Sequence, residues 1–255
     1  MSMLGPYASY NKETGTAVWN PENPNAEYVG IFERINVQPK GIIHVGMWDF
    51  VEWFCYKKLC GTNVIGVEAN QFIYETMSKP VADEHGFTSF NAYISDKDDV
   101  ERDFYFAGEG SSLYQGPPQW NKTESIKVKT KTLSTLLKEN DIDLSQFDFL
   151  NVDAEGSELD ILKGFEDDLK YINVIDMETS VNDRHLSGAP HQTIVEWLSE
   201  RGFGLREMSA SYEREGWGDS VFVRNDRDLS PFVDGNAGNK VYGEGYLERL
   251  SPWGK

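Results

Sequence analysis

The sequence lacks long apolar runs, cysteines at a metal-binding or disulfide spacing, and an excess of basic residues. No apolar run approaches the ~18 residues of a membrane-spanning helix, and the first residues show no cationic segment followed by an apolar stretch. The two cysteines, Cys55 and Cys60, share one segment with helical spacing, which favours reduced thiols over a disulfide. We therefore expect a soluble, cytoplasmic protein without a membrane partner.

The charge is strongly negative. The 255 residues include 24 Lys and Arg against 42 Asp and Glu, so the formal net charge is −18. A surface of this sign repels the phosphates of nucleic acids and of anionic lipids. Nucleic acid is therefore not an expected partner, and the composition leaves the oligomeric state open.

Short apolar runs alternate with segments of helical spacing from residue 41 onward. The runs "GIIHVGM", "NVIGVEAN", "FTSFNAYISD", "FDFLNVD" and "NVIDMETS" predict buried strands, and helical segments follow most of them, one of which Pro80 must kink or divide. This alternation predicts an α/β fold with a mostly parallel sheet and helices on both faces. The alternating runs "RDFYFAG" and "SIKVKTKT" flank a Gly- and Pro-rich connection and predict a β-hairpin insertion. We expect one domain at 41–225, between an irregular arm at 1–40 and an irregular tail at 226–255.

Ligands of open α/β sheets bind outside the carboxyl ends of the strands. Gly46 follows the first predicted strand and would let the backbone approach a ligand closely. Glu68 ends the second strand, where a carboxylate commonly binds the two hydroxyls of a ribose. The alternative is that Glu68 only caps the next helix.

Four carboxylates crowd the segment "FLNVDAEGSELDILKG", directly after another predicted strand. Ser157 and Asp160 have the spacing of a capping box, and acidic residues in the first helical turn, such as Glu158, complement the helix dipole. Asp153 and Glu155 precede the helix and are expected to point toward the ligand crevice, with Glu178 on the neighbouring strand.

These segments, together with "GSSLYQ" and "KVKTKTLSTLLKEN", resemble the FkbM family of S-adenosylmethionine-dependent methyltransferases in order and spacing. The resemblance runs from about residue 41 to residue 225. Its most specific part is the pattern D-x-E-G-x-E-x-x-x-L-K-G from Asp153 to Gly164.

The resemblance implies a class I methyltransferase fold, which is Rossmann-like, with seven strands and the sixth in an antiparallel pairing at the edge. It implies S-adenosyl-L-methionine as cofactor and O-methylation of a hydroxyl on a small molecule or glycan-like acceptor. The residues that it places at the cofactor are His44, Gly46 and Glu52 at the methionine part, Glu68, Ala69 and Asn70 at the ribose, Asn91, Ala92 and Tyr93 at the adenine, and Asp153 near the methyl group.

Candidate catalytic residues are Asp153, Glu155 and His185, each able to accept the proton of a hydroxyl. His185 lies in a predicted loop at 181–191 that could gate the substrate, and the alternative is a solvent-exposed loop histidine. Carboxylates could also bind a divalent cation, but Asp153, Glu155 and Glu178 lack the spacing of a calcium loop, so no metal ligand is predicted.

One departure from the family pattern concerns the first loop, where Phe50 replaces the usual second glycine. Its benzyl group either packs under the following helix or occupies space that the cofactor needs. The second case would make the chain a non-catalytic binding or scaffolding domain of the same fold, with its tryptophan-rich loops as a partner or carbohydrate surface. Those tryptophans could equally be hydrophobic anchors for long loops.

Overall fold

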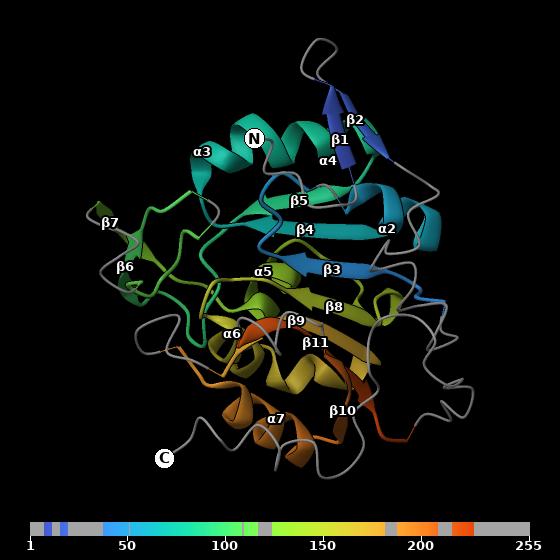
Figure 1. The fold of residues 1–255 in the computed structure, drawn as a ribbon, viewed down its shortest axis with the longest axis vertical. Helices are drawn as coiled ribbons and strands as arrows, with labels where there is room; N and C mark the ends of the chain where they lie inside the picture. The colour runs from blue at the N-terminus through green and yellow to red at the C-terminus, as the bar shows by residue number, and fades with distance from the viewer. Residues whose placement is uncertain are drawn as a thin grey trace.

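The structure, a computed structural model, describes residues 8–11, 16–19, 38–50, 52–108, 110–116, 124–181, 188–208 and 216–226. Its centre is a seven-stranded sheet in the order β10-β11-β9-β8-β3-β4-β5 (Figure 1). The strands are β3 Ile42–Val45, β4 Val64–Glu68, β5 Thr88–Asn91, β8 Phe149–Val152, β9 Val174–Ser180, β10 Phe203–Met208 and β11 Trp217–Arg224.

The sheet is mostly parallel, as predicted. All four pairings among β3, β4, β5, β8 and β9 are parallel. The sixth strand of the sheet along the chain, β10, lies at the edge and pairs antiparallel with β11, which is also antiparallel to β9. The α/β class and the antiparallel edge pairing are therefore confirmed.

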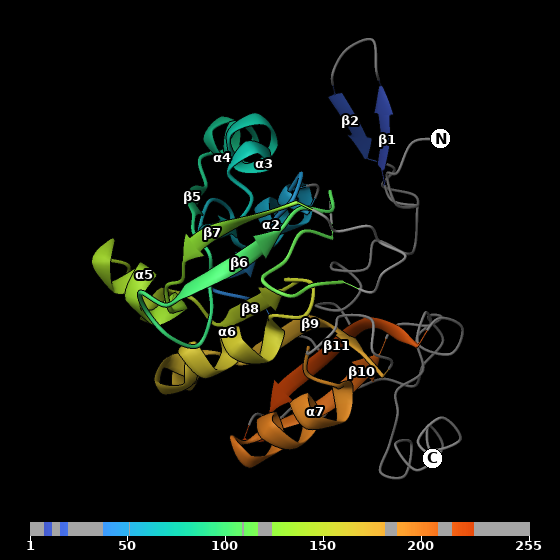
Figure 2. The same ribbon diagram turned by 90° about the vertical axis from the view of Figure 1, so that its left-hand side faces the viewer.

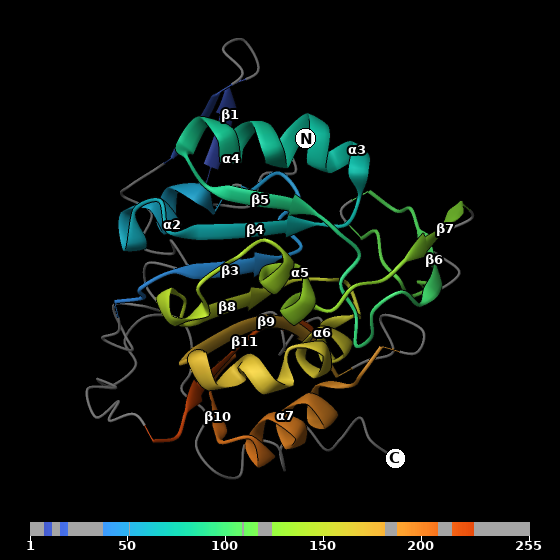
Figure 3. The same cartoon turned by 180° about the vertical axis from the view of Figure 1, so that it is seen from behind.

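Helices cover both faces of the sheet because neighbouring side chains of each strand point to opposite faces. Ile43 and Val45 of β3 face the core under α5, α6 and α7, whereas Ile42 packs with residues of α2 and α4 on the other face. Figure 3 shows the first group of helices in front of the sheet. The helices are α2 Trp53–Cys60, α3 Gln71–Ile73, α4 Lys79–His85, α5 Leu133–Glu139, α6 Glu158–Gly164 and α7 His191–Glu200. Within the described ranges, no helix has the length and apolar character to cross a membrane.

Two helical segments are interrupted, one of them as predicted. Pro80 lies in the first turn of α4, directly after the π-helical turn Tyr74–Ser78. The N–H that proline lacks is therefore missing where the α-helical hydrogen-bond pattern is already interrupted. The helical segment after β8 is also divided, after Gly164, where a Cβ atom would lie 2.3 Å from the Ser95 carbonyl oxygen and glycine is therefore required. The chain continues as the 3₁₀ helix Glu166–Tyr171, and a further short 3₁₀ helix spans Leu144–Gln146.

The predicted hairpin insertion is confirmed by the antiparallel strands β6 Glu101–Tyr105 and β7 Ser125–Lys129. Figure 2 shows the hairpin crossing in front of the carboxyl ends of the parallel strands. It is therefore placed to cover the edge of the sheet where ligands bind.

The N-terminal arm is less irregular than predicted. Strands β1 Ala8–Asn11 and β2 Thr16–Trp19 pair antiparallel, with Ala8 opposite Trp19. Each strand has four residues, which is too short for alternation to be recognised in the sequence. The predicted tail after residue 226 lies outside the described residues.

Candidate active site

A cavity of about 710 Å³ opens at the carboxyl edge of the parallel strands, between the sheet and the hairpin. Most of the predicted site residues line it, and among the described residues no Lys or Arg does. The predicted residues that line it are His44, Gly46, Glu52, Glu68, Ala69, Ala92, Tyr93, Asp153 and Glu155.

The ends of β3 and β8 are joined at Gly46. The Gly46 N–H donates to the Val67 carbonyl oxygen at 2.8 Å, and the Asp153 N–H donates to the Val45 carbonyl oxygen at 2.9 Å. Gly46 has a φ of +95°, and a Cβ atom there would lie 1.7 Å from the Asp153 carbonyl oxygen. Glycine is thus required because two loops of the site touch there, in addition to any approach to a ligand.

Glu68 joins the loops after β3 and β4. Its carboxylate accepts the Trp48 N–H at 2.9 Å and the Asn70 N–H at 2.7 Å. Burial raises the pKa of this carboxyl, and the backbone hydrogen bonds oppose the rise. Glu68 therefore holds the backbone of Trp48, which has a φ of +46°. The Glu68 side chain also lines the cavity. The structural and ligand-binding interpretations of Glu68 are compatible.

His44 lies at the bottom of the cavity, only 2 % exposed. Burial lowers the pKa of its imidazole to about 3, so the ring is neutral at physiological pH. Its Nδ1 lies 3.2 Å from the Tyr56 hydroxyl, which accepts a hydrogen bond from Asn151 Nδ2 at 2.7 Å. This buried chain fixes the orientation of the ring under the Gly46 turn.

Phe50 does not line the cavity. Its ring is fully buried and makes edge contacts with His44, Tyr56 and Phe87, at centroid distances of 5.9, 6.1 and 5.7 Å. The backbone φ of +58° at Phe50 explains why glycine is common at this loop position, since few other residues adopt it without strain. Of the two alternatives for this residue, the structure shows packing in the core.

A second group of carboxylates lies across the cavity. Oxygens of Asp153, Glu155 and Glu178 lie within 4.8 Å of one another, close enough for one cation to contact all three. Asp153 is exposed to the cavity, and within the described part of the chain no hydrogen bond reaches its carboxylate. Desolvation inside the cavity, followed by the charges of Glu178 and Glu155, raises the pKa of Asp153 well above its ordinary value.

The predicted capping box at the start of α6 is wrong. The Ser157 side chain makes no capping hydrogen bond. Instead Glu158 folds back, and its Oε1 accepts the N–H groups of Ala154 at 3.2 Å and Gly156 at 2.9 Å. Burial raises the pKa of Glu158 to about 7. Glu158 therefore holds the turn that carries Asp153 and Glu155, a role that the helix-dipole argument did not predict.

Two predicted cofactor residues are not at the cavity surface. The Asn70 side chain caps α3 by accepting the N–H groups of Phe72 and Ile73. The Asn91 side chain donates to the carbonyl oxygens of Glu68 at 2.8 Å and Ala69 at 3.0 Å. Both shape the loop after β4. His185, and most of the predicted gate at 181–191, lie outside the described residues.

Sequence reasoning did not assign the part of the site that the hairpin supplies. Phe104 and the segment 110–113 line the cavity from the hairpin side, and Trp217 lines it from the start of β11. The signal in the sequence was the "GSSLYQ" segment, in which Ser112 and Tyr114 contact Glu155 and Asp160, more than forty positions away, and such contacts could not be inferred from spacing.

Glu52 also lines the cavity, at the N-terminal end of α2. Its Oε2 atom is buried and has no hydrogen-bond partner among the described residues. Burial, with smaller contributions from the charges of Asp49 and Asp219, raises its pKa to about 7. A proton or a cationic group of a ligand would stabilise this carboxyl.

Comparison with protein families matches residues 37–205 to the methyltransferase FkbM domain. Among solved structures, the methyltransferase domain of METTL16 is 11% identical, with 87% of each chain covered and a TM-score of 0.47. TrmK of M. capricolum in complex with S-adenosyl-homocysteine is 10% identical, with 78% of this chain and 68% of that chain covered and a TM-score of 0.44. A precorrin-6y methyltransferase from Geobacter metallireducens is 11% identical, with 77% and 86% covered and a TM-score of 0.43. A comparison with curated proteins gave no match.

Proposed function

Because the chain belongs to the FkbM methyltransferase domain family, we propose that it transfers the methyl group of S-adenosyl-L-methionine to a hydroxyl of a small, sugar-like acceptor. The observation that carries the proposal is the Asp153 carboxylate, exposed at the cavity floor beside the Gly46 turn. The absence of Lys and Arg from the described lining favours a neutral acceptor over a phosphorylated one.

The residues present fit the cofactor. The cavity has a size typical of small-molecule sites, and its cofactor side offers the Glu68 carboxylate, the Gly46 turn and the Tyr93 ring. Bound S-adenosylmethionine supplies an electrophilic methyl group on a positively charged sulfur. Glu68 would bind the ribose hydroxyls, and the carboxylates at the other side would face the cationic end.

Asp153 would accept the proton of the acceptor hydroxyl at its carboxylate. Its raised pKa makes it a stronger base than an ordinary aspartate once it is ionised. Glu155 and Glu178 would orient the hydroxyls of the acceptor by accepting hydrogen bonds. Holding the hydroxyl in line with the methyl group supplies the larger part of the rate acceleration.

The alternative, a non-catalytic domain with a blocked cofactor site, is not favoured. It required Phe50 to occupy the cofactor space, and the Phe50 ring is instead fully buried among His44, Tyr56 and Phe87. Replacing Phe50 by glycine would therefore remove a core side chain without enlarging the described cavity.

Two measurements test the proposal. Titration calorimetry with S-adenosyl-homocysteine should show binding to the wild-type chain, and its absence would refute the cofactor assignment. Transfer of a labelled methyl group from S-adenosylmethionine to methyl glycosides, cyclitols and simple alcohols should give product with at least one neutral polyol. Product formed only with amines or phosphorylated compounds would refute the assigned acceptor class.

A further inference from the structure

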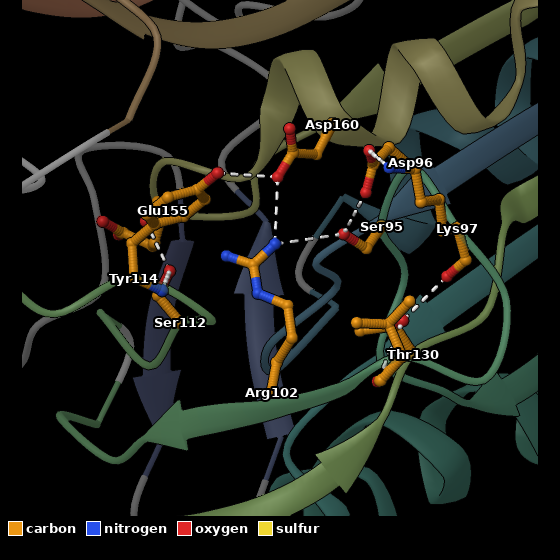
Figure 4. A network of polar contacts seen from close by, with 10 residues as sticks. Ser95, Asp96, Lys97, Arg102, Ser112, Tyr114, Thr130, Glu155 and Asp160 are labelled. Atoms are coloured by element: carbon orange, nitrogen blue, oxygen red, sulfur yellow. Dashed lines mark hydrogen bonds and ion pairs between the residues drawn. The ribbon is translucent and has the colours of Figure 1, made fainter.

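Polar side-chain contacts join the β6–β7 hairpin and its connection to α6 and to the turn after β8 (Figure 4), and a backbone bridge joins Lys131, just after β7, to Ile94. The hairpin's own apolar cluster, formed by Phe104, Leu113 and Val128, is separate from the two main cores and packs against Ala69 and Tyr93. Side-chain hydrogen bonds add to these contacts where the connection of the hairpin reaches the turn that carries Asp153 and Glu155.

Asp160 of α6 is the central contact. Its Oδ2 accepts the Tyr114 hydroxyl at 2.6 Å and Arg102 Nη1 at 3.2 Å. Figure 4 shows Arg102 reaching from β6 to Asp160 and also to Ser95. The guanidinium carbon lies 4.9 Å from the centre of the Tyr114 ring. The Arg102 and Asp160 side chains are only 24% and 17% exposed, so this ion pair is better shielded than an ordinary surface pair.

Two residues before Tyr114, Ser112 reaches the turn that carries the site carboxylates. Ser112 is 2 % exposed, and its hydroxyl donates to the Glu155 carbonyl oxygen at 2.7 Å. The same oxygen atom of Ser112 accepts the Tyr114 N–H at 3.0 Å. The position of Ser112 is thus coupled directly to that of Tyr114.

Glu155 needs such support because its backbone is strained. Its φ is +54°, a conformation that side chains other than glycine rarely adopt. Glu158 holds the turn from the helix side through the N–H groups of Ala154 and Gly156. Ser112 holds the same turn from the hairpin side, through the carbonyl of Glu155 itself.

We propose that Ser112 and the Arg102–Tyr114–Asp160 junction are positioning residues, which hold the Glu155 carboxylate in place for the acceptor by fixing its strained backbone. The role in catalysis rests on the proposed function, since Glu155 must contact the acceptor for its position to matter. None of the four residues is assigned a contact with the reacting atoms. The connection of the hairpin thereby links the cavity wall at 110–113 to the position of the Glu155 carboxylate.

The first test is hydrogen exchange, read by mass spectrometry on a peptide that spans residues 153–158. In Ser112→Ala the amides of this turn should exchange about tenfold faster than in the wild type, as expected for the loss of one hydrogen bond. Tyr114→Phe, which keeps the ring against Arg102 and removes only the hydroxyl, should give a smaller increase in the same peptide. Unchanged exchange in Ser112→Ala would overturn the inference.

The second test separates positioning from stability. Turnover of the best neutral polyol should fall about tenfold in Ser112→Ala, while the dissociation constant for S-adenosyl-homocysteine should stay within about twofold. The control Lys127→Met removes an exposed ion pair with Asp103 on the same hairpin, and it should change neither exchange at 153–158 nor turnover. Equal losses of turnover in Ser112→Ala and Lys127→Met would show a general effect of hairpin stability and overturn the inference.

The two proposals fail separately. If the wild-type chain does not bind S-adenosyl-homocysteine, the proposed function fails, and faster exchange in Ser112→Ala would then support only the structural coupling. If the wild-type chain binds it and transfers methyl groups, but Ser112→Ala has wild-type exchange and turnover, the positioning role fails and the proposed function stands.

Discussion

The two sides of the cavity use the same type of residue in different ways. On the β3–β4 side, the Glu68 carboxylate accepts two backbone N–H groups and joins two loops. On the β8–β9 side, Asp153 occupies the equivalent place after its strand, but its carboxylate faces the cavity and two other carboxylates. The two acidic residues differ in how many backbone N–H groups reach them, so the Glu68 carboxylate is held by the backbone and the Asp153 carboxylate is open to the cavity.

The difference also separates stability from chemistry. A carboxylate with two N–H donors is held in one orientation, whereas a carboxylate beside two others retains a proton more readily and costs stability when all are ionised. Replacing Glu68 should therefore mainly weaken cofactor binding, whereas replacing Asp153 should mainly lower turnover.

Asp153→Asn should have the largest effect on turnover. It keeps the shape of the side chain and removes the base, so turnover should fall by about 100- to 1,000-fold. Binding of S-adenosyl-homocysteine should change by less than about threefold, since the proposed adenosine site is on the β3–β4 side. Kinetics and calorimetry on the same preparation check this. A parallel loss of binding and turnover would contradict the division of the cavity.

Gly46→Ala should have the largest effect on stability. The new methyl group would overlap the Asp153 carbonyl oxygen, and the φ of +95° adds backbone strain, so the free energy of unfolding should fall by about 3 kcal/mol or more. Gly61→Ala is the matched control, because Gly61 also has a positive φ but no atom lies within 4 Å of the added methyl group. Gly61→Ala should cost only about 1–2 kcal/mol. Urea unfolding of both variants checks the comparison.

Glu158→Gln should change the pH dependence of stability. The pKa of Glu158 is raised from its ordinary 4.5 to about 7, so the folded state favours the protonated form. Its stabilising contribution is complete below pH 4.5 and is lost as the pH rises to about 7. The glutamine variant lacks this loss and should become more stable relative to the wild type by up to about 3 kcal/mol across that interval. A constant difference at all pH values, measured by urea unfolding, would contradict a raised pKa.

Glu68→Gln should weaken S-adenosyl-homocysteine binding by about 1.5–3 kcal/mol, the range for a charge-assisted hydrogen bond. The amide can accept only one of the two N–H groups well and directs its own N–H toward the other. Glu68→Gln is the counterpart of Asp153→Asn. Its loss of S-adenosyl-homocysteine affinity should be at least as large, as a fold-change, as its loss of turnover at saturating cofactor. Calorimetry with both variants decides whether the two sides differ as described.

Local patterns in the sequence were sufficient for the sheet. β3 and β8 are buried apolar runs whose strand character depends on their own residues, and the hairpin was visible from alternation around a Gly- and Pro-rich connection. The loop after β3 was harder, because the sequence does not show that Phe50 can adopt a positive φ and place its ring in the core.

Contacts between distant segments decided the rest of the site. Asp160 has a local capping-box spacing with Ser157, yet its carboxylate binds Arg102, 58 residues earlier, and Tyr114, 46 residues earlier. Asn91 ends β5, in the position that the resemblance gives to an adenine contact, but its amide donates to the loop after β4. One sequence alone does not show which of several possible partners a polar side chain will bind in the folded chain.

The insertion of β11 between β9 and β10 has a consequence for synthesis of the protein. The family match ends at residue 205, before Trp217 begins the strand that separates its two neighbours. A growing chain that has emerged only to that point has every residue of the match but leaves β9 with an open edge, which invites pairing with other chains. It also lacks the Trp217 part of the cavity wall. Among the described residues, the last strand along the chain is therefore the one that closes the edge of β9 and adds Trp217 to the cavity wall.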